Sequence, residues 1–460
     1  MVTLLRPRSG ILSHVRELTV HGTKKGEDRL KLVIAAILQD RVRGFWTFIN
    51  LDSLTWCLLL LSQRNIRWMW HSPWPTSPGY FESSELDSEE HQESIDSLLP
   101  EVSSIGLEVQ ASGASNECVL NSIKSISRCC PKITALTLSK NLDSISEESE
   151  TSLSALLNHL NEAPLFSNLT KLRLCSLDIA TPGDQTLCKN FNISQLRILH
   201  IIECDYLIPF LEELSSFYID CTGRLNELII LLPEDLAQPL GTYQAMERLL
   251  RICPKLQILY IDFEGYGPVA KDCILAHCQT LISLQITFGE DEWDNTFTEY
   301  MTSISGACTK LDRLAIDMPN LDAHAHDIPG FKADFQTVIS KTTTIRAFRI
   351  FTVTKHADDE DLLLMRHETL RQVLMQNLAN QIMRFMAKQG SNLKILSFKP
   401  AQVNEELPGQ ELVRDGNGHR WPEYHYCRGH ATDITGTNVV IAHPSRNIAL
   451  EFPGLAEFFY

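Results

Sequence analysis

The sequence predicts an α/β solenoid in which short parallel strands alternate with helices. A six-residue pattern with apolar residues at its first, fourth and sixth positions recurs along the chain, and the segments between copies have helical periodicity. Clear copies begin at Val15, Ile133, Leu169, Leu196, Leu225, Leu256, Leu281, Leu311, Ile345 and Leu393. Weaker copies begin at Phe45, Ile66 and Val102.

The spacing of these copies identifies the type of repeat. From Ile133 to Ile345 successive copies begin 36, 27, 29, 31, 25, 30 and 34 residues apart. Leucine-rich repeats have a period of roughly 20–29 residues, and longer intervals are accommodated as loops. One such hexamer is common by chance, but a near-regular succession is a strong signal for this architecture.

Each unit is predicted to contain one strand and one helix. Side chains alternate along a strand, so the fourth and sixth residues of each hexamer point into the core. Before the strand that begins at Leu256, Met246, Leu249, Leu250 and Cys253 form one apolar helical stripe. Parallel strands need right-handed crossovers. We therefore expect a right-handed horseshoe with strands on the concave face and helices on the convex face.

The repeats divide the chain into a solenoid over residues 1–400 and a C-terminal cap over 401–460. Residues 72–101 are interpreted as an acidic insertion loop, with a regulated acidic segment as the alternative. Asp358–Lys388 is expected to form one long convex-side helix, or alternatively a partner-binding helix. In the cap, Val439–His443 and Ile448–Phe452 are predicted to be strands.

The charge and hydropathy of the chain restrict its possible partners. The 460 residues carry 41 Lys and Arg against 57 Asp and Glu, a net charge of −16. Ten of the acidic residues lie between His71 and Ile123, where no Lys or Arg occurs. This balance argues against nucleic acid as a partner. Apolar runs such as Trp56–Leu61 are far shorter than the ~20 residues of a membrane helix. We expect a cytoplasmic or nuclear protein.

Several of the 13 cysteines are predicted to be structural. Cys130, Cys253, Cys278 and Cys308 each precede the first apolar residue of a hexamer by three positions, where a small thiol suits a helix-to-strand corner. Cys175 and Cys204 follow strands, where a thiol can satisfy loop backbone groups.

The sequence contains no recognisable catalytic motif. It lacks a phosphate-binding loop, a His-Glu-x-x-His pair and a Gly-x-Ser-x-Gly elbow, so no enzymatic activity, catalytic residue or cofactor is predicted. The alternative to a non-enzymatic protein is a zinc site, or an enzyme that uses one, formed by His419, His425, Cys427 and His430. Their spacing does not match paired-ligand patterns, and an exposed hairpin without metal is favoured.

A protein partner is expected on the concave face, where strand positions three, five and seven point. Aromatic and arginine side chains dominate interface energetics, and acidic ones can select a basic group. The candidate partner-binding residues are Arg173, His200, Tyr260, Asp262, Arg313, Asp317 and Arg349. This register would also expose four apolar side chains, those of Ile198, Ile202, Ile229 and Ile258. Exposed apolar groups favour a binding face or a covering loop.

The helix-corner-strand segments Leu249–Ile261 and Ile126–Leu138 resemble the cysteine-containing repeats of fungal F-box/leucine-rich-repeat proteins. Ile11–Val20 and the Trp-rich stretch from Phe45 to Trp70 are similar to their first units. The resemblance implies a substrate-recognition subunit of a cullin-type (SCF) ubiquitin ligase. An F-box, which binds a Skp-type adaptor, does not precede the first strand and would have to lie upstream. A free-standing repeat scaffold without a ligase role is the alternative.

Overall fold

The computed structural model consists of two compact units, Met1–Pro254 and Lys255–Tyr460, which are described separately. The structure describes residues 15–20, 27–37, 39–47, 55, 58–59, 62–63, 66–71, 102–109, 123, 127, 130–140, 153, 166–179, 191–220, 223–233, 236, 238–253, 255–263, 268–288, 295–317, 333–351, 368–398, 424–445, 448–456 and 458. The predicted acidic insertion at 72–101 lies outside these residues.

Parallel strands in sequence order form the sheet of the first unit. Successive strands of this unit pair with one another. Within the described residues the strands are β1 Glu17–Val20, β2 Gly44–Thr47, β3 Trp68–His71, β4 Ser104–Val109, β5 Ala135–Lys140, β6 Lys171–Cys175, β7 Ile198–Ile202 and β8 Glu227–Leu231.

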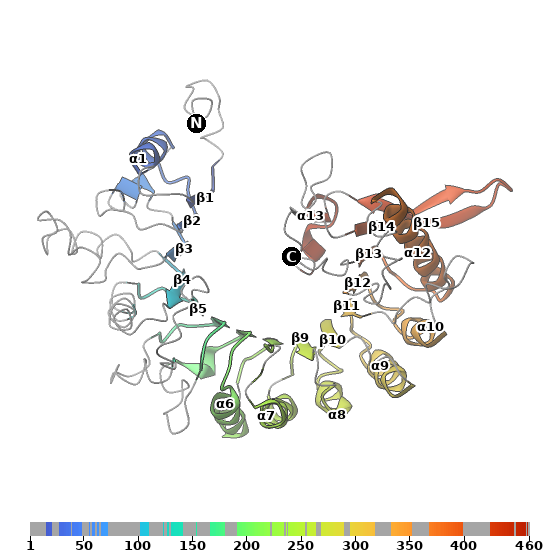
Figure 1. Ribbon diagram of the computed structural model, residues 1–460, viewed down its shortest axis with the longest axis horizontal. Helices are drawn as coiled ribbons and strands as arrows, with labels where there is room; N and C mark the ends of the chain where they lie inside the picture. Colours follow the sequence, from blue (N-terminus) through green and yellow to red (C-terminus); the bar gives the residue numbers. More distant parts are fainter. Residues whose placement is uncertain are drawn as a thin grey trace, which may run out of the picture. The chain divides into compact units, whose positions relative to one another are not determined.

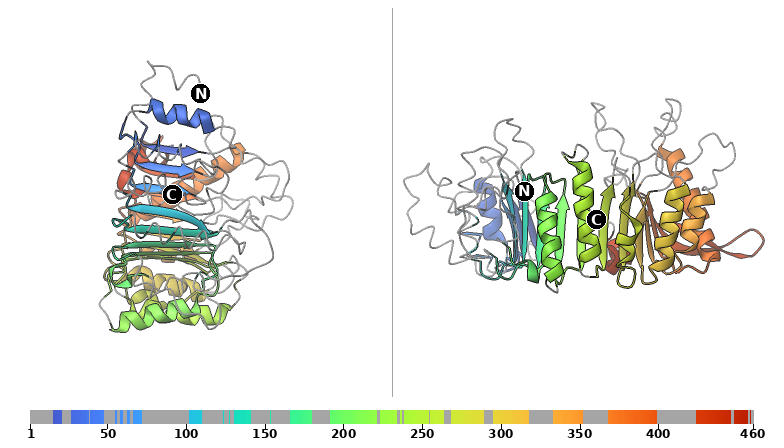
Figure 2. Two further views of the ribbon diagram at one scale, coloured as in Figure 1. Left: turned by 90° about the vertical axis from the view of Figure 1, so that its left-hand side faces the viewer. Right: turned by 90° about the horizontal axis from the view of Figure 1, so that it is seen from below.

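Helical segments connect these strands along one side of the sheet. They include α1 Glu27–Ala36, the 3-10 turn η5 Ile193–Gln195, α6 Ile208–Asp220 and α7 Pro239–Ile252. Helices α6 and α7 lie side by side on the same side of β7 and β8 (Figure 1). Their axes run roughly along the strands, as the turned views show (Figure 2).

The second unit repeats this arrangement and ends in a hairpin. Strands β9 to β13 are parallel and in sequence order, whereas β14 and β15 pair antiparallel. Their bounds are β9 Ile258–Phe263, β10 Ser283–Phe288, β11 Arg313–Ile316, β12 Ala347–Ile350, β13 Ile395–Phe398, β14 Tyr424–Thr432 and β15 Asn438–Ser445.

Most helices of the second unit lie on one side of its sheet. They are α8 Lys271–Leu275, α9 Asn295–Ala307, α10 Ala333–Ser340 and α12 Glu368–Lys388, and two short helices follow the hairpin, α13 Ile448–Glu451 and α14 Pro453–Ala456. The architecture of each unit is therefore α/β, with successive parallel strands of leucine-rich-repeat-like sequence. It is compatible with the predicted solenoid.

The fourth and sixth hexamer positions form continuous apolar ladders in the core. In the first unit Leu172, Leu199 and Leu228 are adjacent in register and 0 % exposed. In the second unit the equivalent row is Leu259, Leu284, Leu314, Phe348 and Leu396, each also 0 % exposed. Strand alternation thus places the residues between them on the opposite face of each sheet.

One predicted repeat start is wrong by three residues. Phe45 pairs with Leu18, the fourth residue of the first hexamer, so the second repeat begins at Val42, which is 0 % exposed. The error arose because Thr47 occupies the sixth, core-facing position in place of an apolar residue. The hexamers at Ile66 and Val102 enter β3 and β4 as predicted.

Hydroxyl side chains connect adjacent repeats just before the strands begin. Ser103 Oγ donates to Arg67 O (3.1 Å), Thr134 Oγ1 to Ser103 O (3.3 Å) and Thr170 Oγ1 to Thr134 O (3.1 Å). Each bond links one repeat to the preceding one, so the series supports the register of β3 to β6.

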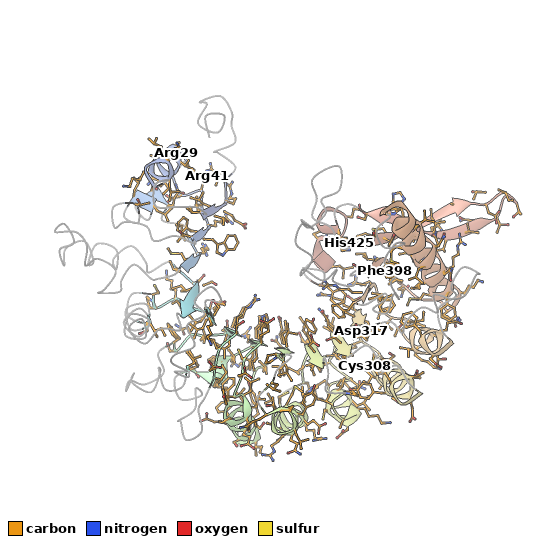
Figure 3. The ribbon with its side chains drawn as sticks, in the orientation of Figure 1. Arg29, Arg41, Cys308, Asp317, Phe398 and His425 are labelled. Carbon is orange, nitrogen blue, oxygen red and sulfur yellow. The ribbon has the colours of Figure 1, made fainter. Side chains whose placement is uncertain are left out.

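The predicted corner role holds for Cys130, Cys253 and Cys308, which are buried. Burial raises the pKa of the Cys253 and Cys308 thiols to about 12. Cys308 lies where α9 leads into β11 (Figure 3). Cys278 is different, because it is half-exposed and the neighbouring His277 is the buried residue at that corner, at 1 % exposure.

The two cysteines predicted to follow strands behave differently. Cys204 is buried beyond β7, donates to Ile202 O (3.4 Å), and has a pKa raised to about 12 by burial. Cys175 is instead the last residue of β6 and accepts a hydrogen bond from Arg173 Nε (3.3 Å).

The long helix α12 covers the edge of the sheet at β15. Gln376 Nε2 donates to Ala442 O (2.7 Å), Asn380 Oδ1 accepts from Ala442 N (2.8 Å), and Arg384 Nε donates to Val440 O (2.9 Å). Side chains spaced four residues apart on one helix face therefore satisfy backbone groups that an edge strand leaves unpaired. The predicted N-terminal part of this helix, 358–367, lies outside the described residues.

The predicted strand at Ile448–Phe452 is wrong. This segment contains helix α13, and α14 follows it directly. Ile448, Phe452 and Leu455 are spaced by four and three residues, as on one face of a helix. The predicted strand at Val439–His443 lies within β15.

Candidate functional site

The face of each sheet that the connecting helices do not cover is the candidate site, and we call it the open face. In the first unit its rows are set by register: Ala135, Lys171, Ile198 and Glu227 form one row, and Thr137, Arg173, His200 and Ile229 the next. Arg173 is exposed on this face.

His200 is on the open face but is more enclosed than the sequence predicts. It is 7 % exposed, and its Nε2 lies 2.8 Å from Glu227 Oε1 on the adjacent strand. The diagonal position of Glu227 allows its side chain to reach the imidazole. Much of the His200 surface is thus used within the protein.

The open face of the first unit also has apolar character. Ile198, Ile202 and Ile229 are half-buried, as is Ile258 at the start of β9 in the second unit. The prediction that these four would be exposed apolar groups is therefore only partly correct. A partly accessible isoleucine row beside Arg173 gives a surface with both apolar and cationic contacts.

An aromatic and cationic group occupies the open face of the second unit. Tyr260 on β9 stacks on Phe351, which directly follows β12, with ring centroids 5.9 Å apart and an interplanar angle of 8°. The guanidinium carbon of Arg349 lies 5.1 Å from the centroid of the same Phe351 ring. Tyr260 and Arg349 are both half-buried.

The charged candidates of this unit differ in accessibility. Asp262 is half-buried, whereas Asp317 is 6 % exposed and therefore contradicts the expectation of an accessible acidic group. Arg313 is half-buried, and its Nε lies 3.9 Å from Asp312 Oδ2, which is beyond hydrogen-bond distance.

Three polar groups near the aromatic stack are buried without hydrogen-bond partners in the described part of the chain. They are Gln285 Oε1 and Thr287 Oγ1 on β10 and Arg313 Nε on β11. Most buried polar side-chain atoms in proteins have a partner, and an unsatisfied one costs roughly 1–3 kcal/mol.

A serine–histidine pair lies further along the same face. His425 Nδ1 is 2.9 Å from Ser397 Oγ, and burial followed by the nearby Arg349 charge lowers the pKa of His425 to about 4 (Figure 3). Ser397 is 0 % exposed. The serine is inaccessible to a substrate in this arrangement, and a histidine with this pKa is a weak base at neutral pH. The pair therefore has the properties of a structural contact.

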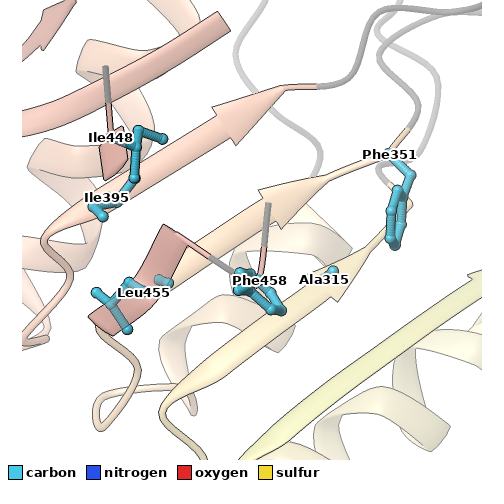
Figure 4. Close-up of a cluster of buried hydrophobic side chains, with 7 residues drawn as sticks. Ala315, Phe351, Ile395, Ile448, Leu455 and Phe458 are labelled. Carbon is cyan, nitrogen blue, oxygen red and sulfur yellow. The ribbon is translucent and has the colours of Figure 1, made fainter. Parts of the chain in front are cut away.

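The two short helices after the hairpin cover part of the open face. We call residues 448–458 the return segment. Its Ile448, Leu455 and Phe458 pack with Ala315, Ala347 and Ile395 of β11 to β13 and with Phe351, which follows β12 (Figure 4). Tyr260 and Phe452 lie against this cluster. Sequence reasoning missed this covering, although the helical spacing of Ile448, Phe452 and Leu455 was a usable signal.

The candidate zinc ligands do not converge. His425 and Cys427 face one side of β14 and His430 the other, and Cys427 Sγ donates to Glu451 Oε2 (3.1 Å). His419 lies outside the described residues. Among those described, no group of three His, Cys, Asp or Glu side chains is placed to hold a metal ion. No helix in that same part of the chain is long and apolar enough to cross a membrane.

Comparisons with known proteins add little to this description. No family model and no curated protein matches the chain. A crystal structure of a TLR13–ssRNA13 complex aligns with a TM-score of 0.31 and 10 % sequence identity, covering 68 % of this chain and 43 % of the other. The chain therefore spans less than half the length of that protein. A TM-score this low supports no conclusion about shared function.

Proposed function

We propose that this protein is a non-enzymatic scaffold that binds another protein on the open face of its sheets. In this proposal the units form a right-handed leucine-rich-repeat horseshoe, and the open face is its concave surface. The observation that carries the proposal is the set of buried, unsatisfied polar atoms of Gln285, Thr287 and Arg313 beside the Tyr260–Phe351 stack. Tyrosine and arginine beside a desolvated polar group are typical of interface hot spots.

The proposed partner surface combines aromatic, cationic and hydrogen-bonding groups. Tyr260 and Arg349 provide large contact area, while Gln285 and Thr287 offer acceptors and Arg313 a donor for the partner. Among the described residues these atoms have no hydrogen-bond partner, although Arg313 Nε also lies within ion-pair distance of Asp312 Oδ2 (3.9 Å). A buried polar atom that lacks a hydrogen bond is unfavourable. Binding of a polar segment would recover that cost.

Affinity capture with the 460-residue chain tests the proposal. Wild type, Gln285→Ala/Arg313→Ala and the control Val373→Ala, which alters a half-exposed residue on α12, are used as baits, and captured proteins are quantified by mass spectrometry. Proteins retained by wild type and the control, but reduced about tenfold or more with the double variant, support the proposal. Identical capture by all three baits contradicts it.

We further propose, from the resemblance to F-box/leucine-rich-repeat proteins, that the bound protein is a ubiquitin ligase substrate. Mixing the purified chain with a Skp-type adaptor, both as it stands and with any upstream coding sequence included, tests this step by size-exclusion chromatography. A stable complex with the extended chain supports a ligase role. Absence of a complex in both cases leaves a free-standing scaffold.

A further inference from the structure

We propose that the open face of β11 to β13 is a docking surface for a short amphipathic helix of a partner protein, and that the return segment is its intramolecular occupant. The partner helix would present apolar side chains with the spacing of Ile448, Phe452 and Leu455 and a carboxylate at the position of Glu451. The inference rests on the proposed function, because it uses the open face as the binding surface.

The composition of the covered strands is the first observation. Ala315, Ala347 and Ile395 occupy open-face positions and are each 0 % exposed. In a repeat sheet these positions face solvent unless something covers them, and here they are apolar. Two alanines leave space above the backbone, and Leu455 and Phe458 pack over the face there (Figure 4).

The polar contact at Glu451 fixes the direction of the segment. Glu451 Oε2 accepts from Cys427 Sγ (3.1 Å), and Glu451 Oε1 accepts from Ser445 Oγ (2.8 Å). These two contacts orient α13 against the end of the hairpin while its apolar residues enter the face. A ligand helix would need a carboxylate at this position to make the same hydrogen bonds.

The return segment has the features of a removable occupant. Helices α13 and α14 have four residues each, and helices this short do not persist without tertiary contacts because nucleation is unfavourable. Pro453 and Gly454, which link the apolar contacts, are exposed. Among the described residues, the contacts of the segment with the face come from the apolar side chains of Ile448, Leu455 and Phe458 and from the Glu451 carboxylate. Another helix of similar pattern could make the same contacts.

The covered area is continuous with the unsatisfied polar cluster of the proposed binding face. Phe351 contacts the return-segment cluster and also stacks on Tyr260. A partner that displaced the segment would thus extend onto Gln285 and Arg313. As a tethered ligand, the segment acts at an effective concentration that reaches the millimolar range for short linkers, so it lowers the affinity for any competing helix.

Displacement of the segment in the 460-residue chain tests the proposal. Leu455→Asp/Phe458→Asp removes two of its apolar anchors, and Val373→Asp is the matched control at a site away from the segment. The probe is a fluorescein-labelled peptide with the sequence of residues 446–460, and binding is measured by fluorescence anisotropy. A peptide with Glu451→Gln and one with both Asp substitutions serve as ligand controls.

We expect the double variant to bind the wild-type peptide at least about tenfold more tightly than wild type and Val373→Asp do. The Asp-substituted peptide should not bind, and the Glu451→Gln peptide should bind more weakly. Alkylation of Cys427 by iodoacetamide, mapped by mass spectrometry, should be faster in the double variant and slower again when peptide is added.

Equal peptide binding by wild type and a folded double variant, or no saturable binding to that variant, would overturn the proposal. Folding is checked by circular dichroism, and the milder Ile448→Ala/Phe458→Ala variant replaces the double variant if it unfolds. No cellular partner is present in this experiment. A negative result here therefore concerns only the docking of a helix. The proposed function is tested by the capture experiment, which uses a chain with an intact return segment.

Discussion

Tyr260 and Phe351 stack across the open face of the second unit, although strands β10 and β11 lie between the strands that carry them. Their centroids are 5.9 Å apart and their planes are nearly parallel. Ala315 on β11 belongs to the same buried cluster. A methyl side chain at that position leaves room for larger apolar groups of the cluster above the sheet.

The first prediction concerns the energy of this stack. Tyr260→Ala, Phe351→Ala and the double variant form a cycle in which we expect a coupling of about 0.5–1.5 kcal/mol, because parallel ring pairs contribute this much beyond burial. Urea unfolding followed by fluorescence provides the free energies. A cycle between Tyr260→Ala and Val373→Ala should show no coupling, and an uncoupled Tyr260–Phe351 pair would contradict the geometry.

The second prediction concerns His277, which replaces a cysteine at one helix-to-strand corner. Its Nδ1 accepts the backbone N–H of Leu256 at 3.2 Å in a buried position. His277→Leu removes this acceptor, so we expect a loss of about 1–3 kcal/mol in unfolding free energy. Cys278→Ala, at the half-exposed neighbouring position, should cost clearly less. Equal losses for the two variants would show that the hydrogen bond is not important.

The third prediction concerns the pH dependence of stability. The pKa of His425 is lowered from 6.5 to about 4 in the folded protein. Between these two values the unfolded chain binds a proton that the folded one excludes, so stability is fully present above pH 6.5 and decreases as the pH falls towards 4. The expected loss is about 2–3 kcal/mol.

Urea unfolding between pH 7 and 4 measures this loss. His425→Asn should remove most of the slope attributable to this site. His430→Asn, on the opposite face of β14 and exposed, should retain it. A slope that is the same in wild type and His425→Asn would contradict the assignment of the effect to this histidine.

The fourth prediction concerns the edge strand β15. Gln376 and Asn380 bind the carbonyl and amide groups of Ala442, so Gln376→Ala/Asn380→Ala should leave the edge unpaired and promote self-association through strand pairing. Multi-angle light scattering over a concentration series measures the change in mass. Val373→Ala on the same helix should remain unchanged, and an unchanged mass for the double variant would refute the edge-covering role.

The strand positions were largely predictable from sequence because each hexamer carries its own apolar pattern. Leu172 and Leu284 lie in the predicted core rows for this reason. The pattern fails at Val42 because Thr47 fills a core position with a polar residue. A single hexamer cannot reveal such a substitution, but the pairing of Phe45 with Leu18 does.

The candidate site was less predictable because side-chain contacts across strands have no local signature. Phe351 follows its strand and was not among the predicted residues, yet it contacts both Tyr260 and Arg349. The sequence predicts a strand at Ile448–Phe452 because this stretch alternates between apolar and small or polar residues. The surface on which the return segment packs depends on Ala315 and Ala347, which individually have no unusual feature in the sequence.

Site-specific photocrosslinking tests the central claim that the open face binds a protein partner. Benzoylphenylalanine is placed at Gln285 or, as a control, at Val373 on α12 of the 460-residue chain. Covalent adducts formed in cells are identified by mass spectrometry. Binding on the open face predicts a discrete protein adduct from position 285 that is absent from position 373. The claim is contradicted if position 373 gives a partner adduct and position 285 gives none. It is also contradicted if both positions give the same adduct.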